Sequence, residues 1–434
     1  MKRVCFLTNY YDYLKSFSPL ILTEEQIKMF LKAGYKPVAI VTEGFTPPDD
    51  SYFNKIELRM IHNVFRDDDK YKDKSFEDDV NMLAFEIEKH LKDVDVVITH
   101  DLLYMPDYTK YNLAARIVAK KNPKLKWLHW IHSCTPINLL SDMRQKFIDV
   151  FPSIVDKPFP NSLAVFPNTY DIPRVAKSLG FKEKDVRCVP HPIDYCKYNK
   201  FEKDTIKLVE DRNLLDADAI CVYPLRLDRG KQPHIVLEIM AEVKNRGKST
   251  RVIFIDLQSN SQDPNDDKFK YREELKQQAI DLGFNKDEVI FTSEFIPEWN
   301  LEVSRSVVAD LMRLANVFIL PSRSETFSLV ALEAEIQGAS IVLNQDFPPM
   351  RSIYHDMAHY RRFSSNIDIT ADIKDANGDT NTEYSDRKGY MSEIASTIIG
   401  DLNKNPLKGM TYFRKNNNMN VIFLNYIEPL LGEE

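Results

Sequence analysis

The sequence predicts an α/β protein with two domains, each built on a parallel sheet of the Rossmann type. Two observations lead to this prediction. The chain has 434 residues, which is long for one domain and sufficient for two. Short apolar runs alternate along it with amphipathic, helix-like segments. That alternation is typical of repeated βαβ units, whose strands are buried on both faces of the sheet.

Six apolar runs in the first half are expected to form strands. They are Val4–Leu7, Val38–Val41, Val94–Ile98, Trp127–Ile131, Leu163–Phe166 and Val186–Val189. Between the first two, the segment Thr23–Gln26 has the composition of a capping box. It predicts the start of a helix that ends near Gly34.

Five further runs in the second half are expected to form the strands of a second sheet. They are Ala219–Tyr223, Val252–Ile255, Val289–Phe291, Val317–Leu320 and Ser340–Leu343. The amphipathic segments Ile235–Val243 and Arg272–Leu282 are expected to be helices between them.

Composition restricts the class of protein. With 43% hydrophobic and 28% charged residues, the chain has the balance of a soluble globular protein. No apolar run approaches the roughly 20 residues that span a bilayer, and the start of the chain is too soon polar for a secretory signal. Five scattered cysteines favour a reducing compartment over a disulfide framework. We therefore expect a cytoplasmic protein without a transmembrane segment.

The segment Phe318–Gly338 contains the clearest chemical signal. Its apolar start is expected to be a strand that stops at Pro321, and a helix is expected to follow from near Ser328. Two carboxylates, Glu325 and Glu333, lie eight residues apart, one in the connecting loop and one in the helix. The free amide groups and partial positive charge of a helix start can hold a diphosphate. With an acid on each side, the segment predicts a nucleotide-sugar site.

Three motifs together resemble those of glycosyltransferase family 4, whose members have the GT-B fold. The first is the pair Glu325 and Glu333 after a strand that ends in Pro-Ser. The second is Arg226 and Lys231, five residues apart in a loop after an apolar run, and the third is His132 in Trp-Ile-His-Ser. The resemblance implies two Rossmann-like domains with an interdomain cleft, and a C-terminal helix that returns to the first domain.

The resemblance also indicates where the domains divide. Val189–Asp194 is similar to the interdomain turn of the family. We therefore expect an acceptor-binding domain over residues 1–195 and a nucleotide-sugar donor domain over residues 196–405. Residues 406–434 are expected to form the terminal helix that packs on the first domain.

The predicted reaction requires positive groups near the leaving diphosphate. Breaking the bond between a sugar's anomeric carbon and a diphosphate develops negative charge on the leaving group, and positive groups stabilise the transition state. Arg226 offers a bidentate fork and Lys231 a compact charge, so both are predicted to neutralise the diphosphate. Thr326, Phe327 and Ser328 are predicted to add backbone N–H donors. With these groups, no metal or other cofactor is required.

The roles of the two acids follow from the resemblance. In relatives the first Glu contacts sugar hydroxyls and the second binds ribose hydroxyls, which implies these roles for Glu325 and Glu333, with a UDP-sugar favoured as the donor. Relatives transfer a hexosyl or pentosyl group with retention of configuration, and the leaving phosphate can accept the acceptor's proton. His132 would then orient the sugar; the alternative is that His132 is a buried histidine of the core.

The chain departs from the family in three places. Relatives usually have a glycine-rich loop after the first strand, where this chain has tyrosines instead. Tyr10 and Tyr11, together with His100 at the end of another predicted strand, are therefore the candidates for the acceptor side. Thr326 and Ser328 stand where relatives have glycines around the Phe, and Gln232 replaces a common Gly after the Lys.

The acceptor has two candidates. One is a cell-surface glycan or lipid at a membrane surface, met by the basic segment Lys110–Lys126. The other is a hydroxymethylated base of phage DNA, which would place the protein in host cytoplasm. In that case the same segment would meet phosphates, and interleaved aromatic residues would stack on a flipped base; these are Tyr104, Tyr108, Tyr111 and Trp127. A different class is a catalytically inactive GT-B-like protein that binds a nucleotide or a glycan.

Overall fold

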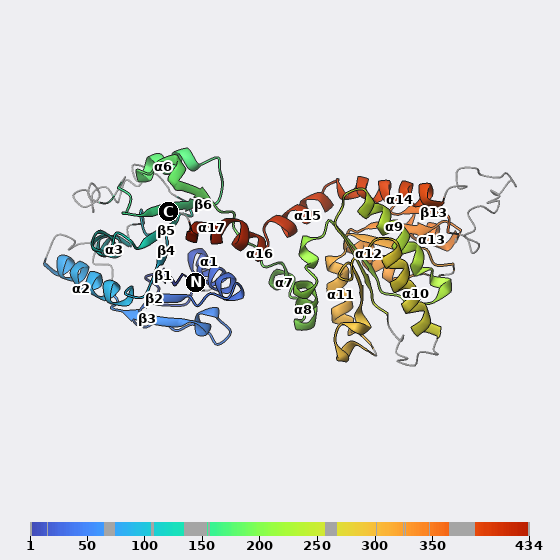
Figure 1. The fold of residues 1–434 in the computed structure, drawn as a ribbon, viewed down its shortest axis with the longest axis horizontal. Coiled ribbons are helices and arrows are strands. Elements are labelled where there is room, and N and C mark those ends of the chain that lie inside the picture. Colours follow the sequence, from blue (N-terminus) through green and yellow to red (C-terminus); the bar gives the residue numbers. More distant parts are fainter. Residues whose placement is uncertain are drawn as a thin grey trace. The chain divides into compact units, whose positions relative to one another are not determined.

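The computed structural model divides the chain into two compact units (Figure 1). Unit 1 comprises Met1–Ile193 and Met419–Glu434, and unit 2 comprises Asp194–Asn418. The structure describes residues 2–14, 16–64, 74–105, 108–133, 154, 157–256, 267–300, 302–323, 325, 327–346, 348–363 and 387–432.

Unit 1 is built on a seven-stranded sheet in the order β3-β2-β1-β4-β5-β6-β7, with every pair parallel. The strands are β1 Val4–Leu7, β2 Val38–Thr42, β3 Glu57–Ile61, β4 Val96–His100, β5 Lys126–Trp130, β6 Ser162–Phe166 and β7 Val186–Cys188. All six predicted strands are confirmed to within two residues. The sequence prediction missed β3, because this edge strand alternates exposed and buried positions and has no apolar run.

Helices cover both faces of this sheet. Helices α2 (Lys74–His90), α3 (Thr109–Lys121) and α6 (Ile172–Leu179) pack on the face that includes Cys5 and Trp127. Helix α1 (Ser18–Lys32) packs on the opposite face. The pattern of strand residues buried on both sides is the one expected of βαβ units.

The predicted start of α1 is wrong. The helix begins at Ser18, with a proline in its first turn, and Thr23 lies inside it. The Thr23 hydroxyl donates to the carbonyl oxygen of Pro19 (2.7 Å), and the Glu24 carboxylate accepts from the Tyr52 amide (2.8 Å). The Thr23 hydroxyl is also hydrogen-bonded to that of Tyr10 (3.0 Å), so neither residue caps the helix. The predicted end is confirmed, since Gly34 follows the helix with a φ of 81°.

Unit 2 is built on a six-stranded parallel sheet in the order β10-β9-β8-β11-β12-β13. Its strands are β8 Ala219–Tyr223, β9 Thr250–Phe254, β10 Val289–Phe291, β11 Val317–Leu320, β12 Ser340–Asn344 and β13 His359–Arg361. The five predicted strands are confirmed, and the half-buried edge strand β13 was missed.

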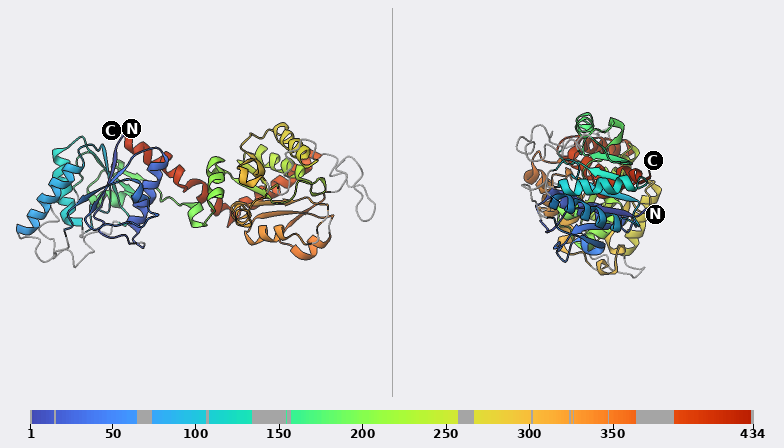
Figure 2. Two further views of the ribbon diagram at one scale, coloured as in Figure 1. Left: turned by 90° about the horizontal axis from the view of Figure 1, so that it is seen from below. Right: turned by 90° about the vertical axis from the view of Figure 1, so that its left-hand side faces the viewer.

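Helices again cover both faces of the unit 2 sheet (Figure 2). One face is covered by α9 Pro233–Asn245, α10 Asp267–Asp281 and α14 Arg387–Leu402. The other is covered by α8 Lys203–Asp211, α11 Arg305–Leu314, α12 Leu329–Ile336 and α13 Pro348–Tyr354. The two predicted helices correspond to α9 and α10.

The last segment of the chain returns to unit 1. It consists of α16 (Met419–Ile422), a π-helical turn (Phe423–Ile427) and α17 (Glu428–Gly432). Its apolar side chains pack with α1; the ring of Phe423 meets that of Phe30 edge-on at 5.1 Å. This return of the terminal segment to the first domain was expected.

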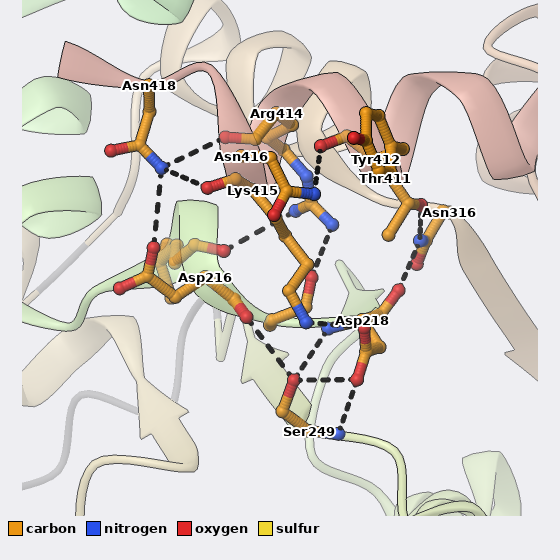
Figure 3. Close-up of polar contacts among 12 residues, drawn as sticks. Asp216, Asp218, Ser249, Asn316, Thr411, Tyr412, Arg414, Lys415, Asn416 and Asn418 are labelled. Atoms are coloured by element: carbon orange, nitrogen blue, oxygen red, sulfur yellow. Dashed lines mark hydrogen bonds and ion pairs between the residues drawn. The ribbon is translucent and has the colours of Figure 1, made fainter. Parts of the chain in front are cut away.

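Helix α15 (Leu407–Asn416) belongs to unit 2, although the predicted terminal segment begins at residue 406. Figure 3 shows the reason. The buried Arg414 guanidinium donates to the carbonyl oxygens of Leu214 (3.4 Å) and Ala217 (2.6 Å). The Lys415 ammonium pairs with Asp218 at 2.5 Å. These contacts hold α15 on the turn that precedes β8.

Candidate functional site

The loops after β8 and β11 leave the unit 2 sheet at its switch point. Strands β8, β9 and β10 follow one another toward one edge of the sheet, whereas β11 and β12 lie on the other side of β8. The carboxyl ends of parallel strands lie at one edge, and ligands of open α/β sheets bind where the strand order reverses. Both motifs of the second half therefore occupy the position where such a fold binds ligands.

Lys231 and Glu325 meet at this edge. The Lys231 ammonium lies 2.5 Å from the Glu325 carboxylate, with 23% and 15% of the two side chains exposed. Lys231 ends a short 3-10 turn that Asp228 caps through the Gly230 amide (2.6 Å). The Arg323 amide donates to the Gly230 carbonyl oxygen (2.9 Å), which joins the two loops. A partly buried ammonium and a partly buried carboxylate thus form an ion pair at this edge of the sheet.

Arg226 is on the same loop as Lys231, but the described structure shows no hydrogen bond or ion pair that joins it to Lys231 or Glu325. Its side chain is exposed. Two of the three residues predicted to surround the leaving diphosphate and the sugar are therefore brought into contact, and the third is at the same edge.

The start of α12 has free backbone donors. Ser328 adopts a left-handed conformation with a φ of 59°, and its hydroxyl accepts from the Ala331 amide (3.4 Å). The Tyr354 hydroxyl donates to the Ser328 carbonyl oxygen (2.8 Å) and holds the turn. Among the described residues, the amides of Leu329 and Val330 donate to no group. They are the N–H groups that a helix start can offer to an anion.

The other predicted donor residues are placed as follows. Phe327 is 44% exposed. Glu333 lies on α12 and pairs with the guanidinium of Arg305 at the start of α11. A ligand hydroxyl that binds Glu333 would therefore share this carboxylate with Arg305. Thr326 lies outside the described residues.

In unit 1, three histidines gather at the carboxyl edge of the sheet. His100 ends β4 and His132 follows β5; their rings are nearly parallel and meet edge to edge, with Nδ1 of His100 2.8 Å from Nε2 of His132. The ring of His191 lies close to parallel with that of His132, with ring centroids 5.8 Å apart. The His132 amide donates to Asp101 (2.9 Å), which has a φ of 53°.

The hydrogen bonds assign the tautomers of this pair. Nε2 of His100 lies 3.1 Å from Oε1 of Gln26, an atom that can only accept, so His100 has its proton on Nε2. Nδ1 of His100 must then accept from Nε2 of His132. The remaining atom, Nδ1 of His132, has no hydrogen-bond partner among the described residues and can accept a proton or a hydroxyl hydrogen bond.

Burial keeps these histidines neutral. Loss of solvent lowers the pKa of His100 well below its usual value, and the neighbouring His132 and His191 add to the effect. Burial also lowers the pKa of His132, although Asp101 opposes the shift. The Asp101 carboxyl has a raised pKa, mainly through its own burial. The cluster is therefore built for hydrogen bonding by neutral imidazoles.

Acidification is expected to destabilise unit 1. Burial lowers the pKa of His129 to about 3 and that of His100 well below its usual value, whereas unfolded histidines titrate near about 6.5. The unfolded chain therefore binds more protons below that pH, and stability falls as the pH drops. Each of the two histidines contributes up to about 1.4 kcal/mol per pH unit. The raised pKa of Asp101 has the opposite sign, since its contribution is lost as pH rises.

Unfolding of unit 1 between pH 7.5 and 5 measures this dependence. His129→Leu keeps the apolar contacts with Trp127 and Phe159 and removes one titrating group, so the slope should fall by about one proton. An identical slope in the variant and the wild type would show that the shifted His129 has no part in the effect.

Two of the three residues predicted for the acceptor side line a common cavity, and the third does not. Tyr10 and His100 line one small cavity together with Thr8 and Tyr108. The Tyr10 side chain is buried, however, and its hydroxyl is hydrogen-bonded to that of Thr23 (3.0 Å). Tyr11 is 56% exposed and does not line this cavity.

The aromatic residues interleaved with the basic segment do not form a stacking surface. All four belong to the hydrophobic core of unit 1 and have at most 9% of their surface exposed; they are Tyr104, Tyr108, Tyr111 and Trp127. Lys110 pairs with Asp79, and Arg116 donates to the carbonyl oxygens of Ile154 and Lys157. The prediction that these four rings stack on a flipped base is therefore wrong, because the rings are buried in the hydrophobic core of unit 1.

Sequence reasoning missed several residues of the unit 2 site. Arg305 pairs with Glu333, Tyr354 holds the turn before α12, and Gln232 and Asn344 bind the strand-end loops. Only Gln232 gave a signal, since it replaces a common glycine. The others come from distant elements, and their contacts depend on the packed sheet.

Two parallel Rossmann-like sheets and a terminal segment that returns to the first domain define the GT-B fold, so the predicted fold class is confirmed. Residues 205–359, which lie within unit 2, match the family model "Glycosyl transferases group 1". A search of curated proteins found no match.

Several solved structures are similar to the chain. A glycosyltransferase from Rickettsia africae is 14% identical with a TM-score of 0.36, covering 100% of this chain and 99% of that one. Anabaena HepE, solved with UDP and glucose, is 14% identical with a TM-score of 0.34 and full coverage of both chains. WaaG, a glycosyltransferase of lipopolysaccharide biosynthesis, is 11% identical with a TM-score of 0.31 and 98% coverage of both. At these scores the fold assignment rests on the sheet order. Within the described part of the chain, no helix is long and apolar enough to cross a bilayer.

Proposed function

We propose that this protein is a retaining glycosyltransferase that moves a hexosyl or pentosyl group from a nucleoside-diphosphate sugar, a UDP-sugar by preference, to a hydroxyl. One observation supports this proposal above the others. Within the segment that matches the glycosyltransferase model, Lys231 and Glu325 meet at the switch point of a parallel sheet. The fold binds ligands at that point, and the pair provides a cation for phosphate and an acid for sugar hydroxyls.

The donor would bind across the two loops. Lys231 and the exposed Arg226 would face the diphosphate, and the amides of Leu329 and Val330 would add two N–H donors. Glu325 would accept from sugar hydroxyls, and Glu333 from the ribose hydroxyls. Donor binding would then release Lys231 from Glu325, because each gains a partner from the substrate.

The reaction proposed for this site is a displacement with retention. The acceptor oxygen forms a bond to the anomeric carbon on the face from which the diphosphate departs, and the bond from that carbon to the phosphate oxygen breaks. The acceptor's proton passes to the leaving phosphate, so no separate base is needed. His132, whose Nδ1 can accept a hydrogen bond, is proposed to orient the sugar.

For the acceptor, we favour a glycan or lipid hydroxyl over a base of DNA. The aromatic residues that would stack on a flipped base are in the core of unit 1, whereas every base recognised outside a duplex needs such a surface or pocket. DNA binding, if present, should weaken steeply as salt rises. An electrophoretic mobility assay with hydroxymethylated DNA at low and high salt tests this preference. Binding that weakens steeply as salt rises would favour DNA as the acceptor.

Nucleotide-sugar specificity can be tested directly. UDP-, GDP- and ADP-sugars should be compared by thermal shift and by slow donor hydrolysis. We expect one nucleotide to raise the melting temperature, and that donor to be hydrolysed. A shift without hydrolysis or transfer would favour the inactive GT-B-like binding protein. Unchanged melting with every nucleotide would contradict the proposed function.

Glu333 and Arg305 allow a finer test of the donor site. Glu333→Gln should raise the donor KM about tenfold, since a carboxylate bond to a hydroxyl is stronger than that of a neutral amide by about 1–2 kcal/mol. Arg305→Ala should change KM less than about fivefold, because exposed ion pairs contribute about 1 kcal/mol or less. Steady-state kinetics with varied donor measures both. A larger effect in Arg305→Ala than in Glu333→Gln would assign ribose binding to the arginine instead.

A further inference from the structure

Gln232 has an unusual conformation for its residue type. It stands directly before α9 with a φ of 54° and a ψ of 45°, in the left-handed region, and its side chain is completely buried. Glycine adopts this conformation without a steric cost, whereas glutamine does not. Its Oε1 atom is also buried and has no hydrogen-bond partner in the described structure. A non-glycine residue in this region costs about 1–3 kcal/mol and persists only where surrounding contacts hold it.

The side-chain amide nitrogen of Gln232 makes the contacts that hold this conformation. Nε2 of Gln232 donates to the carbonyl oxygen of Pro321 at 2.5 Å and to that of Phe363 at 3.1 Å. Both neighbours are acceptors, so the amide can only be oriented with its nitrogen toward them. Pro321 follows β11 and Phe363 follows β13. One side chain from the loop after β8 therefore binds the ends of two other strands.

A second buried amide completes this arrangement. Nδ2 of Asn344, the last residue of β12, donates to the carbonyl oxygen of Ser322 at 3.0 Å. Its Oδ1 accepts from the amides of Phe363 (3.3 Å) and Asp346 (3.0 Å). Together the two amides satisfy consecutive carbonyl oxygens at Pro321 and Ser322, and both contact Phe363.

We propose that Gln232 and Asn344 are positioning residues of the donor site, which set the loop after β11 so that Glu325 faces Lys231. This inference rests on the proposed function. Gln232 is bonded in sequence to Lys231, and Pro321 lies four residues before Glu325. A bond between Gln232 and Pro321 therefore fixes the two loops close to the Lys231–Glu325 contact. The backbone bond between Arg323 and Gly230 fixes them on the other side.

The positioning role predicts separate effects on rate and on stability. Gln232→Gly leaves the carbonyl oxygens of Pro321 and Phe363 without their amide donor, at about 1–3 kcal/mol each, and relief of the left-handed strain offsets only about 1 kcal/mol, so the melting temperature should fall by roughly 5–10 °C while the protein stays folded at the assay temperature. The donor kcat/KM should fall about 10- to 100-fold, mostly in kcat, because the loop no longer holds Glu325 in place. Gln232→Glu, with acceptors facing two carbonyl oxygens, should be at least as impaired.

Amide hydrogen exchange of the protein without ligand provides an independent measurement. In Gln232→Gly the Arg323 amide, which is bonded to Gly230, should exchange at least about tenfold faster than in wild type. The matched control is Gln337→Gly, an exposed glutamine after α12, which should change neither the exchange of Arg323 nor the kinetics.

The two proposals fail in distinguishable ways. If Gln232→Gly retains wild-type exchange at Arg323 and wild-type kcat and KM, the positioning role is wrong. If exchange accelerates but the wild type neither binds nor hydrolyses any nucleotide-sugar, the loops are tied as described and the proposed function fails. A loss of kcat with unchanged exchange would also contradict positioning, because Gln232 would then act on the substrate itself.

Discussion

Lys231→Ala is expected to reduce sugar transfer by about 10²- to 10³-fold. Removing one preorganised group that stabilises developing negative charge typically has an effect of this size. The Lys231 ammonium lies at the switch point of the unit 2 sheet, 2.5 Å from Glu325, with 23% of its side chain exposed to solvent. Its loss should lower kcat more than it raises KM, since charge on the diphosphate grows in the transition state.

The control for this variant is Lys404→Ala, which removes the same charge from a side chain that is 73% exposed and pairs with Asp401. It should retain wild-type kinetics. Lys231→Arg keeps the charge but changes its shape, so it should recover part of the lost rate. If Lys231→Ala and Lys404→Ala were equally active, the lysine would have no role in the reaction.

Arg414→Ala is expected to destabilise unit 2 by about 3 kcal/mol. The substitution removes the donor of the buried Ala217 carbonyl oxygen and leaves that of Leu214 with the Ala217 amide alone, and an unpaired buried group costs about 1–3 kcal/mol. It also leaves a space where a fully buried guanidinium was packed. For a unit of this size the melting temperature should fall by roughly 10 °C.

Thermal unfolding of Arg414→Ala can be compared with that of Tyr412→Ala. Tyr412 lies on the same helix and is 58% exposed, so its removal should shift the melting temperature by less than about 2 °C. Equal shifts in the two variants would mean that α15 is not held on unit 2 by the arginine.

The fold was predictable because central parallel strands are buried on both faces. Continuous apolar runs such as Val38–Val41 and Ala219–Tyr223 are typical of strands inside a parallel sheet, and both are strands. The edge strands Glu57–Ile61 and His359–Arg361 are partly exposed and lack such runs. Their existence depends on pairing with a neighbour, which a local pattern does not encode.

Local signals also failed where tertiary contacts overrode them. Thr23 and Glu24 have the composition of a helix start, yet α1 begins at Ser18 and uses both side chains for contacts within unit 1. Unit 2 extends to Asn418, beyond the predicted boundary near residue 406, because Arg414 binds the turn at Leu214. That contact joins residues 200 positions apart.

The candidate site was partly predictable for the same reason. Lys231 and Glu325 lie in the loops that follow β8 and β11, so the adjacency of those two buried strands brings the two side chains together. In the sequence, Gln232 differs from the family only as a replacement for glycine, and its hydrogen bonds to Pro321 and Phe363 are not encoded in any local pattern. Such bonds require three strand ends to be placed relative to one another.

Amide hydrogen exchange with and without a bound nucleotide is the most direct test of the central claim. The protein would be saturated with the nucleoside diphosphate that gives the largest thermal shift. We expect slower exchange within unit 2 at residues 226–232 and at the first amides of α12, Leu329 and Val330, and this protection should be lost in Lys231→Ala. Protection confined to other parts of unit 2, or equal protection in the wild type and Lys231→Ala, would contradict the donor site proposed for this protein.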